Sequence, residues 1–302
     1  MQRSRTSSAQ ETLAASINEH PPLARLTGPA LPDTTDTARL VAELREISFP
    51  GFHRLEGAQP AQTGTPDAAL AFAADRLPRF TKHAMALVEC CLNSQAPERA
   101  GQAAQITEAF VERIPQVREL LAADVEAAFH GDPAARSREE VVLCYPGIYA
   151  LTVHRYAHEL WNQEVPILPR MMSELVHGAT GIDIHPGAVI GRGVFIDHGT
   201  GVVIGETCRI GDGCRIYQGV TLGAQRFERN PDGSLRKGVK RHPTLEDNVT
   251  VYAGATILGG DTVIGAGSIV AGGVFVTRSV PPNHLVAGPK LEVRILPGTA
   301  GM

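Results

Sequence analysis

The sequence has little of several features that mark common classes of protein. Aromatic residues make up only 5% of its 302 residues, with a single tryptophan, and no apolar stretch approaches the ~20 residues that cross a bilayer. The N-terminus lacks the apolar core of a signal peptide, and a net charge of −4 gives no general attraction to nucleic acid or anionic lipid. The five cysteines form no C-x-x-C pair, which is typical of a reducing cytosol. We therefore expect a cytoplasmic protein that binds neither membrane nor nucleic acid.

Glycine is scarce in the first part of the chain and abundant in the second. Residues 1–180 contain 8 of the 31 glycines, and residues 181–302 contain 23. In the glycine-poor part, apolar residues recur at helical spacing from residue 35 onward. We predict a mobile polar arm over residues 1–34 and an all-α domain over residues 35–180. Helical runs are expected over residues 35–49, 67–95, 104–129, 147–161 and 171–176.

The periodicity changes after Gly181. Steps of six from Ile184 to Val220, and again from Leu245 to Phe275, place an apolar residue at all thirteen positions. Such a hexapeptide repeat is a β-helix signature: each unit forms one short strand, and glycine turns the corner. Three units make a coil of about 18 residues, and each coil stacks only on its neighbours. We predict a parallel β-helix over residues 181–290, followed by a tail over residues 291–302.

An excursion over residues 224–241 interrupts the repeat. It contains six Arg and Lys residues and two acids, and Asn230-Pro231-Asp232-Gly233 is a turn signal. Two interpretations are open. The excursion is either a solvated loop or a flap over an anionic ligand, since loops on a rigid scaffold often carry function.

Several histidines in the repeat region could carry chemistry. His185, His198 and His242 could in principle bind zinc, but they are 13 and 44 residues apart with no close pair, so we expect no metal site. A general base is the alternative, because histidine accepts a proton near neutral pH and a carboxylate can orient it. His198 and Asp183 are 15 residues apart, which places them on neighbouring coils.

Seven segments between residues 105 and 290 give the chain a resemblance to the bacterial serine O-acetyltransferases, in the branch with extended loops. These segments are DPAA (132–135), GIDIHPGAVIG (181–191), IDHGTGVVIGET (196–207), IYQGVTLGA (216–224), KRHPTLEDNV (240–249), ATILGGDTVIGAGS (255–268) and SVPPNHLVAG (279–288). The resemblance implies a left-handed β-helix and a homotrimer, or a dimer of trimers, with active sites between subunits. It also implies acetyl transfer from acetyl-CoA to L-serine for cysteine biosynthesis, without a metal.

The resemblance further implies a role for individual residues. His198 would be the general base and Asp183 would orient it, while Arg241 would bind the serine carboxylate beside His242. The serine ammonium group would be bound by two carboxylates, those of Asp132 and Asp197. Acetyl-CoA would pass small residues in the groove of the β-helix, namely Gly223, Ala224, Ala253 and Gly272.

Alternatives and departures accompany this interpretation. Homoserine, a sugar or an antibiotic could be the acceptor on the same fold, and a non-enzymatic scaffold is a second class. L-Cysteine could inhibit, as in the family, because it would compete at the serine site. Family members dock into O-acetylserine sulfhydrylase through a tail that ends in Ile, whereas this sequence ends in Met302, which argues against that complex.

Overall fold

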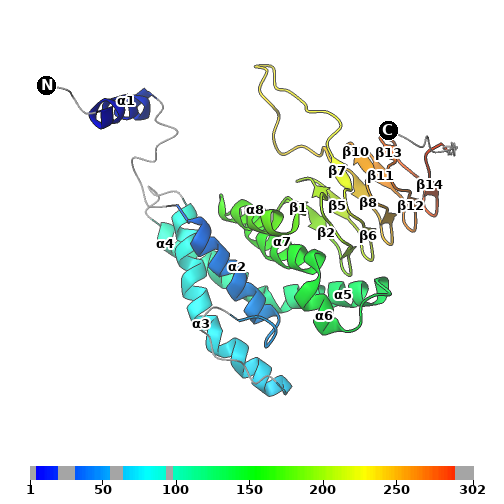
Figure 1. The fold of residues 1–302 in the computed structure, drawn as a ribbon, viewed down its shortest axis with the longest axis horizontal. Coiled ribbons are helices and arrows are strands. Elements are labelled where there is room, and N and C mark those ends of the chain that lie inside the picture. Colours follow the sequence, from blue (N-terminus) through cyan, green and yellow to red (C-terminus); the bar gives the residue numbers. More distant parts are fainter. Residues whose placement is uncertain (1–4, 20–30, 55–63, 93–97, 290–302) are drawn as a thin grey trace, which may run out of the picture.

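A computed structural model describes residues 5–19, 31–54, 64–92 and 98–289. Within these residues, helices occupy the chain up to Thr180 and short strands begin at Asp183 (Figure 1). No described helix has both the length and the apolar composition needed to cross a membrane. The helices are α1 (Arg5–Glu19), α2 (Thr34–Ser48), α3 (Pro66–Cys91), α4 (Arg99–Glu112), α5 (Ile114–Gly131), α6 (Arg138–Cys144), α7 (Pro146–Asn162) and α8 (Leu168–Thr180).

Three features of the helical part differ from the sequence prediction, the first being helix α6, which none of the predicted runs covers. The segment expected to be an arm contains α1, while residues 1–4 and 20–30 lie outside the described residues. The run expected over residues 104–129 is two helices, α4 and α5, which meet at Arg113. Pro115 explains the break, because proline has no N–H for a helix interior and fits the first turn of a new helix.

The strands form three parallel sheets that make the three sides of a coil. Up to β13, successive strands go to sheets A, B and C in turn, so each sheet pairs every third strand, and the last strand, β14, pairs with β12 in sheet C. Sheet A contains β1 (Asp183–Ile184), β4 (Val203–Ile204), β7 (Thr221–Gly223), β10 (Thr256–Leu258) and β13 (Phe275–Val276). Sheet B contains β2 (Val189–Ile190), β5 (Arg209–Ile210), β8 (Thr244–Leu245) and β11 (Val263–Ile264). Sheet C contains β3 (Phe195–Ile196), β6 (Arg215–Ile216), β9 (Thr250–Val251), β12 (Ile269–Val270) and β14 (Leu285–Val286).

The strict period of six is wrong in the last coils. Ile269 is 38% exposed and Phe275 is 67% exposed, although the sequence frame placed both inside. The buried residues are instead Ile264, Val270 and Val276. The frame slips because seven residues, not six, separate the buried Ile257 from Ile264, and the extra residue lies in the turn at Gly259.

The helices and the β-helix share one hydrophobic cluster, which runs from Leu40 in α2 to Val276 in β13. A buried ion pair adds to this packing: Arg155 of α7 contacts both carboxylate oxygens of Asp124 of α5 at 2.7 and 2.8 Å. Arg155 also donates to the carbonyl oxygens of Ile190 and Gly191 in the first coil. These contacts fix α5 and α7 on the β-helix, and the proposed division into domains at residue 181 stays a prediction.

Candidate active site

The turns that lead from sheet C to sheet A, here called the C–A corner, hold Asp197 and His198 after β3. Asp132, at the C-terminal end of α5, is close enough for the His198 charge to act on it. The phenol of Tyr145 donates to Oδ2 of Asp132 at 2.5 Å, and the Ala134 N–H donates to Oδ1 at 2.8 Å. These two hydrogen bonds, and then the His198 charge, hold the pKa of Asp132 below its ordinary value. Asp132 is therefore an anion at neutral pH.

His198 presents an exposed imidazole from an unusual backbone conformation. Its φ of 56° lies in the left-handed region, which a non-glycine residue adopts rarely. The side chain is 68% exposed, and its Nδ1 lies 3.7 Å from Oδ1 of Asp197. Because such backbone conformations persist at functional sites where the surroundings fix them, the geometry is consistent with a reactive role.

A close approach of α7 builds this corner. The N-terminus of α7 packs so tightly on the end of β3 that a Cβ on Gly147 would lie 2.1 Å from the carbonyl oxygen of Ile196. Only glycine fits there. The contact places Tyr145, which precedes α7, beside Asp132 and within electrostatic reach of Asp197.

The turns from sheet A to sheet B, here called the A–B corner, hold Arg241 and His242. The guanidinium of Arg241 forms an ion pair with Glu206 of the preceding coil. The hydroxyl of Thr207 accepts hydrogen bonds from the backbone N–H groups of Arg241 at 2.9 Å and His242 at 3.1 Å. One threonine side chain thus fixes the backbone of both candidate residues.

His242 is buried and held as a neutral imidazole. Its Nδ1 accepts a hydrogen bond from the Thr207 N–H at 3.1 Å, which leaves the proton on Nε2. Burial, with a smaller effect of the Arg241 charge, lowers the pKa of His242 to about 4. At neutral pH this side chain is a hydrogen-bond donor and carries no charge.

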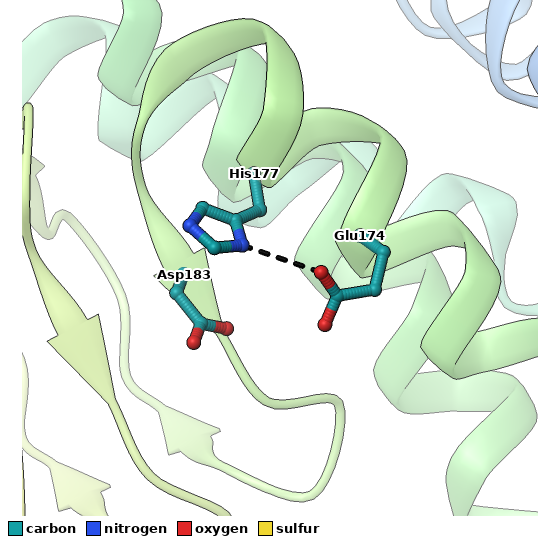
Figure 2. A group of neighbouring side chains, drawn as sticks. All are labelled: Glu174, His177 and Asp183. Atoms are coloured by element: carbon teal, nitrogen blue, oxygen red, sulfur yellow. Dashed lines mark hydrogen bonds and ion pairs between the residues drawn. The ribbon is translucent and has the colours of Figure 1, made fainter.

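Asp183 begins β1 on sheet A and lies beside α8 rather than beside His198. Its Oδ1 is 3.9 Å from Nη1 of Arg170, and its charge acts on His185, whose pKa is lowered chiefly by burial. Figure 2 shows Asp183 with Glu174 and His177 of α8, where His177 Nδ1 lies 3.3 Å from Glu174 Oε2.

The three groups in Figure 2 have the donor types of a metal site, with ligating atoms within 4.8 Å of one another. However, Arg170 forms ion pairs with both Glu174 and Asp183. A cation therefore already compensates the carboxylates, and the cluster does not call for a metal ion.

The structure distributes the predicted residues over two corners. Asp132, Asp197 and His198 gather at the C–A corner, and Arg241 and His242 gather at the A–B corner, on the other edge of sheet A. No hydrogen bond or ion pair joins His198 to Asp183 within the described residues. The histidines considered for zinc are divided in the same way, since His185 and His242 lie at the A–B corner and His198 does not.

The small residues predicted to pass acetyl-CoA are divided too. Gly223 and Ala224 lie where β7 leaves sheet A for the A–B corner. Ala253 and Gly272 lie in successive C–A turns, where a Cβ on Gly272 would lie 3.0 Å from the carbonyl oxygen of Ala253.

Three residues at these corners were not among the predicted site residues. Glu206 and Thr207 lie inside the IDHGTGVVIGET segment, so the motif contained them without indicating their contacts. Tyr145 lies 13 positions from Asp132 in the sequence, and no motif marked it. Only the fold brings its phenol to the carboxylate.

Comparisons with known proteins agree on one family. No family model matches the chain. A plasmid serine acetyltransferase of Synechococcus elongatus is 56% identical over 185 residues, which are 61% of this chain and 58% of that protein. The serine acetyltransferase of Mycobacterium tuberculosis is 48% identical over 165 residues, 55% of this chain and 68% of that protein. Matches to three cyanobacterial serine acetyltransferases cover 51% to 58% of their lengths, so the chain spans little more than half of these relatives.

Solved structures match over more of the chain. Serine acetyltransferase 1 of Entamoeba histolytica in complex with L-cysteine has a TM-score of 0.70 and 36% identity, covering 86% of this chain and 90% of that one. A serine acetyltransferase in complex with CoA has a TM-score of 0.54 and 28% identity, covering 83% and 97%. These sequence identities are higher than a likeness of fold alone would give, and the structural alignments extend through both the helices and the β-helix. This chain therefore belongs to the serine acetyltransferase family.

Proposed function

We propose that the chain transfers the acetyl group of acetyl-CoA to the hydroxyl of L-serine. The products are O-acetyl-L-serine and CoA. The observation that carries this proposal is the pattern of charge at the two corners. A pair of carboxylates at one corner and a guanidinium at the other suit the two charges of an amino acid, whereas a neutral sugar or alcohol needs neither.

The acceptor would be held by its charged ends. Asp132 and Asp197 bind the ammonium group, and the hydrogen bonds from Tyr145 and Ala134 keep Asp132 ionised for this purpose. Arg241 binds the carboxylate, for which its planar guanidinium is suited. Its partner Glu206 holds the guanidinium in place before serine arrives.

The reaction needs a base because a serine hydroxyl is a poor nucleophile while it keeps its proton. The imidazole of His198 removes that proton as the serine oxygen attacks the thioester carbonyl carbon. The tetrahedral intermediate then collapses, the carbon–sulfur bond breaks, and the leaving thiolate takes the proton back from the imidazolium. The proton taken from serine thus returns to the leaving thiolate, and no step uses a metal or a redox cofactor.

The active site would be shared between neighbouring copies of the chain. Within one chain, sheet A separates His198 from Arg241. A ring of three copies places the C–A corner of one copy against the A–B corner of the next, which is a heterologous contact that closes. Asp183 lies on sheet A itself, where its charge reaches His185 of the A–B corner, so it would orient His198 of the neighbouring copy.

Several finer features complete the proposal. The coil of the β-helix is left-handed, and trimers or paired trimers are the assembled form. Acetyl-CoA lies between copies along Gly223, Ala224, Ala253 and Gly272, which is supported by the division of these residues over the same two corners. L-Cysteine inhibits by occupying the serine site, since it carries the same two charged groups as serine.

The experiment is a thiol-release assay with acetyl-CoA and three acceptors, namely L-serine, L-homoserine and a neutral alcohol. We expect turnover with serine, and loss of several orders of magnitude in kcat for His198→Ala with an intact assembly. The alternative acceptor is homoserine, which differs by one methylene, worth about 1–3 kcal/mol in discrimination. Turnover of the neutral alcohol as fast as serine would refute the assignment of the charged groups.

A further inference from the structure

The excursion that interrupts the β-helix encloses a cavity of about 1000 Å³ with the A–B corner. Figure 1 shows the excursion as the long loop between β7 and β8. The cavity walls include Gln225, Lys237 and Arg241 from the loop side and Gly260, Thr262 and Arg278 from the turns of later coils. Its place is adjacent to the proposed acceptor site, because Arg241 and Glu206 also line it.

The loop has internal structure that holds this cavity open. Arg229 and Leu235 form an antiparallel bridge, and the Asn230 N–H donates to the carbonyl oxygen of Ser234 at 2.8 Å. The loop returns to the prism at Lys240, whose ammonium donates to the carbonyl oxygen of Thr207 at 2.7 Å. The contact is close, since a Cβ on Gly260 would lie 2.5 Å from the carbonyl oxygen of Lys240.

The cavity wall carries uncompensated positive charge. Two of its acids are already paired, Glu228 with Arg236 and Glu206 with Arg241. Four further cations line the cavity without an ion pair among the residues that the structure describes, but the ammonium of Lys240 is held by the carbonyl oxygens of Thr207 and Pro243, which leaves Arg226, Lys237 and Arg278. One further acid, Asp261, also lines it. The three free cations outnumber this single acid, so the cavity attracts anions.

The cavity also extends along the axis of the β-helix, the direction in which an elongated acetyl donor would lie. Four A–B turns from successive coils line the cavity. The lining residues of these turns begin at Glu206, Gln225, Gly259 and Thr277. Adjacent strands are 4.7–4.9 Å apart, so the lining turns extend over roughly 14 Å along the prism axis. Arg241 marks the acceptor end, and Arg278 lies at the far end.

We propose that this cavity binds the phosphate groups of the acetyl-CoA nucleotide through Arg226, Lys237 and Arg278. The inference rests on the proposed acetyl transfer and assigns a function to the excursion. The ligand class is a nucleotide with a diphosphate and a separate monophosphate. Guanidinium groups bind such oxygens with paired hydrogen bonds, and the lysine supplies a point charge.

The test compares two acetyl donors that differ only in the nucleotide. The variant Arg226→Gln/Lys237→Gln/Arg278→Gln is assayed by thiol release with acetyl-CoA and with acetylpantetheine, which lacks the phosphates. Each lost charge-assisted contact is worth about 1.5–3 kcal/mol. We therefore expect the wild-type preference for acetyl-CoA, as a ratio of kcat/KM values, to fall at least tenfold in the variant.

Arg229→Gln is the matched control, because this arginine lies in the same loop outside the cavity and its guanidinium donates to the carbonyl oxygen of Gly233. An unchanged donor preference in the triple variant, with wild-type melting temperature, would overturn the proposal. An equal fall of the donor preference in Arg229→Gln would also overturn the proposal.

Calorimetry with adenosine 3′,5′-bisphosphate separates this inference from the proposed function. Binding to the wild type that is lost in the triple variant supports the cavity even where neither donor is turned over. No binding to the wild type alongside normal acetyl transfer would refute the cavity and leave the proposed function intact.

Discussion

Mixing two inactive variants tests whether the active site is shared between copies. His198→Ala destroys the C–A corner of a chain and leaves its A–B corner intact, while Arg241→Ala does the reverse. In a ring of three copies, each site takes one corner from each of two neighbours. A site is therefore intact when an Arg241→Ala chain supplies the C–A corner and a His198→Ala chain supplies the A–B corner.

The expected recovery follows from this geometry. With equal amounts of both variants assembled at random, each corner of a site is intact with a chance of one half, so about one quarter of the sites are complete. Co-expression of the two chains and a thiol-release assay should then give about 25% of wild-type activity per chain, after subtraction of each variant alone.

A matched mixture serves as the control. Asp132 and His198 lie at the same corner, so Asp132→Ala with His198→Ala should recover nothing. Asp183→Asn should recover with His198→Ala and fail with Arg241→Ala, because the charge of Asp183 reaches His185 of the A–B corner and we assign it to that side of the shared site. If the mixture of His198→Ala and Arg241→Ala recovers no activity, or if the Asp132→Ala control recovers as much, the site is contained in one chain.

Three further predictions concern the residues that support the site. Tyr145→Phe removes one hydrogen bond from the Asp132 carboxylate, worth about 1.5–3 kcal/mol, so the serine KM should rise about tenfold or more while the acetyl-CoA KM stays constant; equal changes in both would contradict the role. Thr207→Val leaves the N–H groups of Arg241 and His242 without their acceptor, and should lower the unfolding free energy by about 1–3 kcal/mol, whereas Thr207→Ser, which keeps the hydroxyl, should lose less in denaturant titrations. The pKa of His242 falls from 6.5 to about 4 on folding, so its contribution to stability is complete above pH 6.5 and is lost as the pH falls toward about 4. His242→Gln should therefore flatten the pH dependence of the melting temperature in that range, and an unchanged slope would contradict it.

The repeat pattern contained most of the β-helix. An apolar residue every six positions and glycine at the corners predict short strands that stack, because each unit is locally complete and contacts only its neighbours. The frame failed where a single extra residue near Gly259 moved Ile269 and Phe275 to the surface. A one-residue insertion in a turn leaves the composition almost unchanged, so the sequence gives little sign of it.

The helical part shows the same limit in another form. Apolar spacing predicted helices over most of the region, but the turn at Arg113 and the helix α1 depended on local signals weaker than the periodicity. The contact of Gly147 with Ile196 could not be read from spacing at all, since it joins residues 49 positions apart through packing.

The repeat architecture and the residue types of the candidate site follow from the sequence, because period and motif are local properties of the chain. The grouping of those residues depends on how the chain folds in three dimensions. The fold placed His198 with Asp132 at one corner and Arg241 with His242 at another, and it brought Tyr145 and Thr207 to support them. The physical reason is that the coil direction and the packing of α5 and α7 fix which turns share an edge, and residue spacing carries no such information.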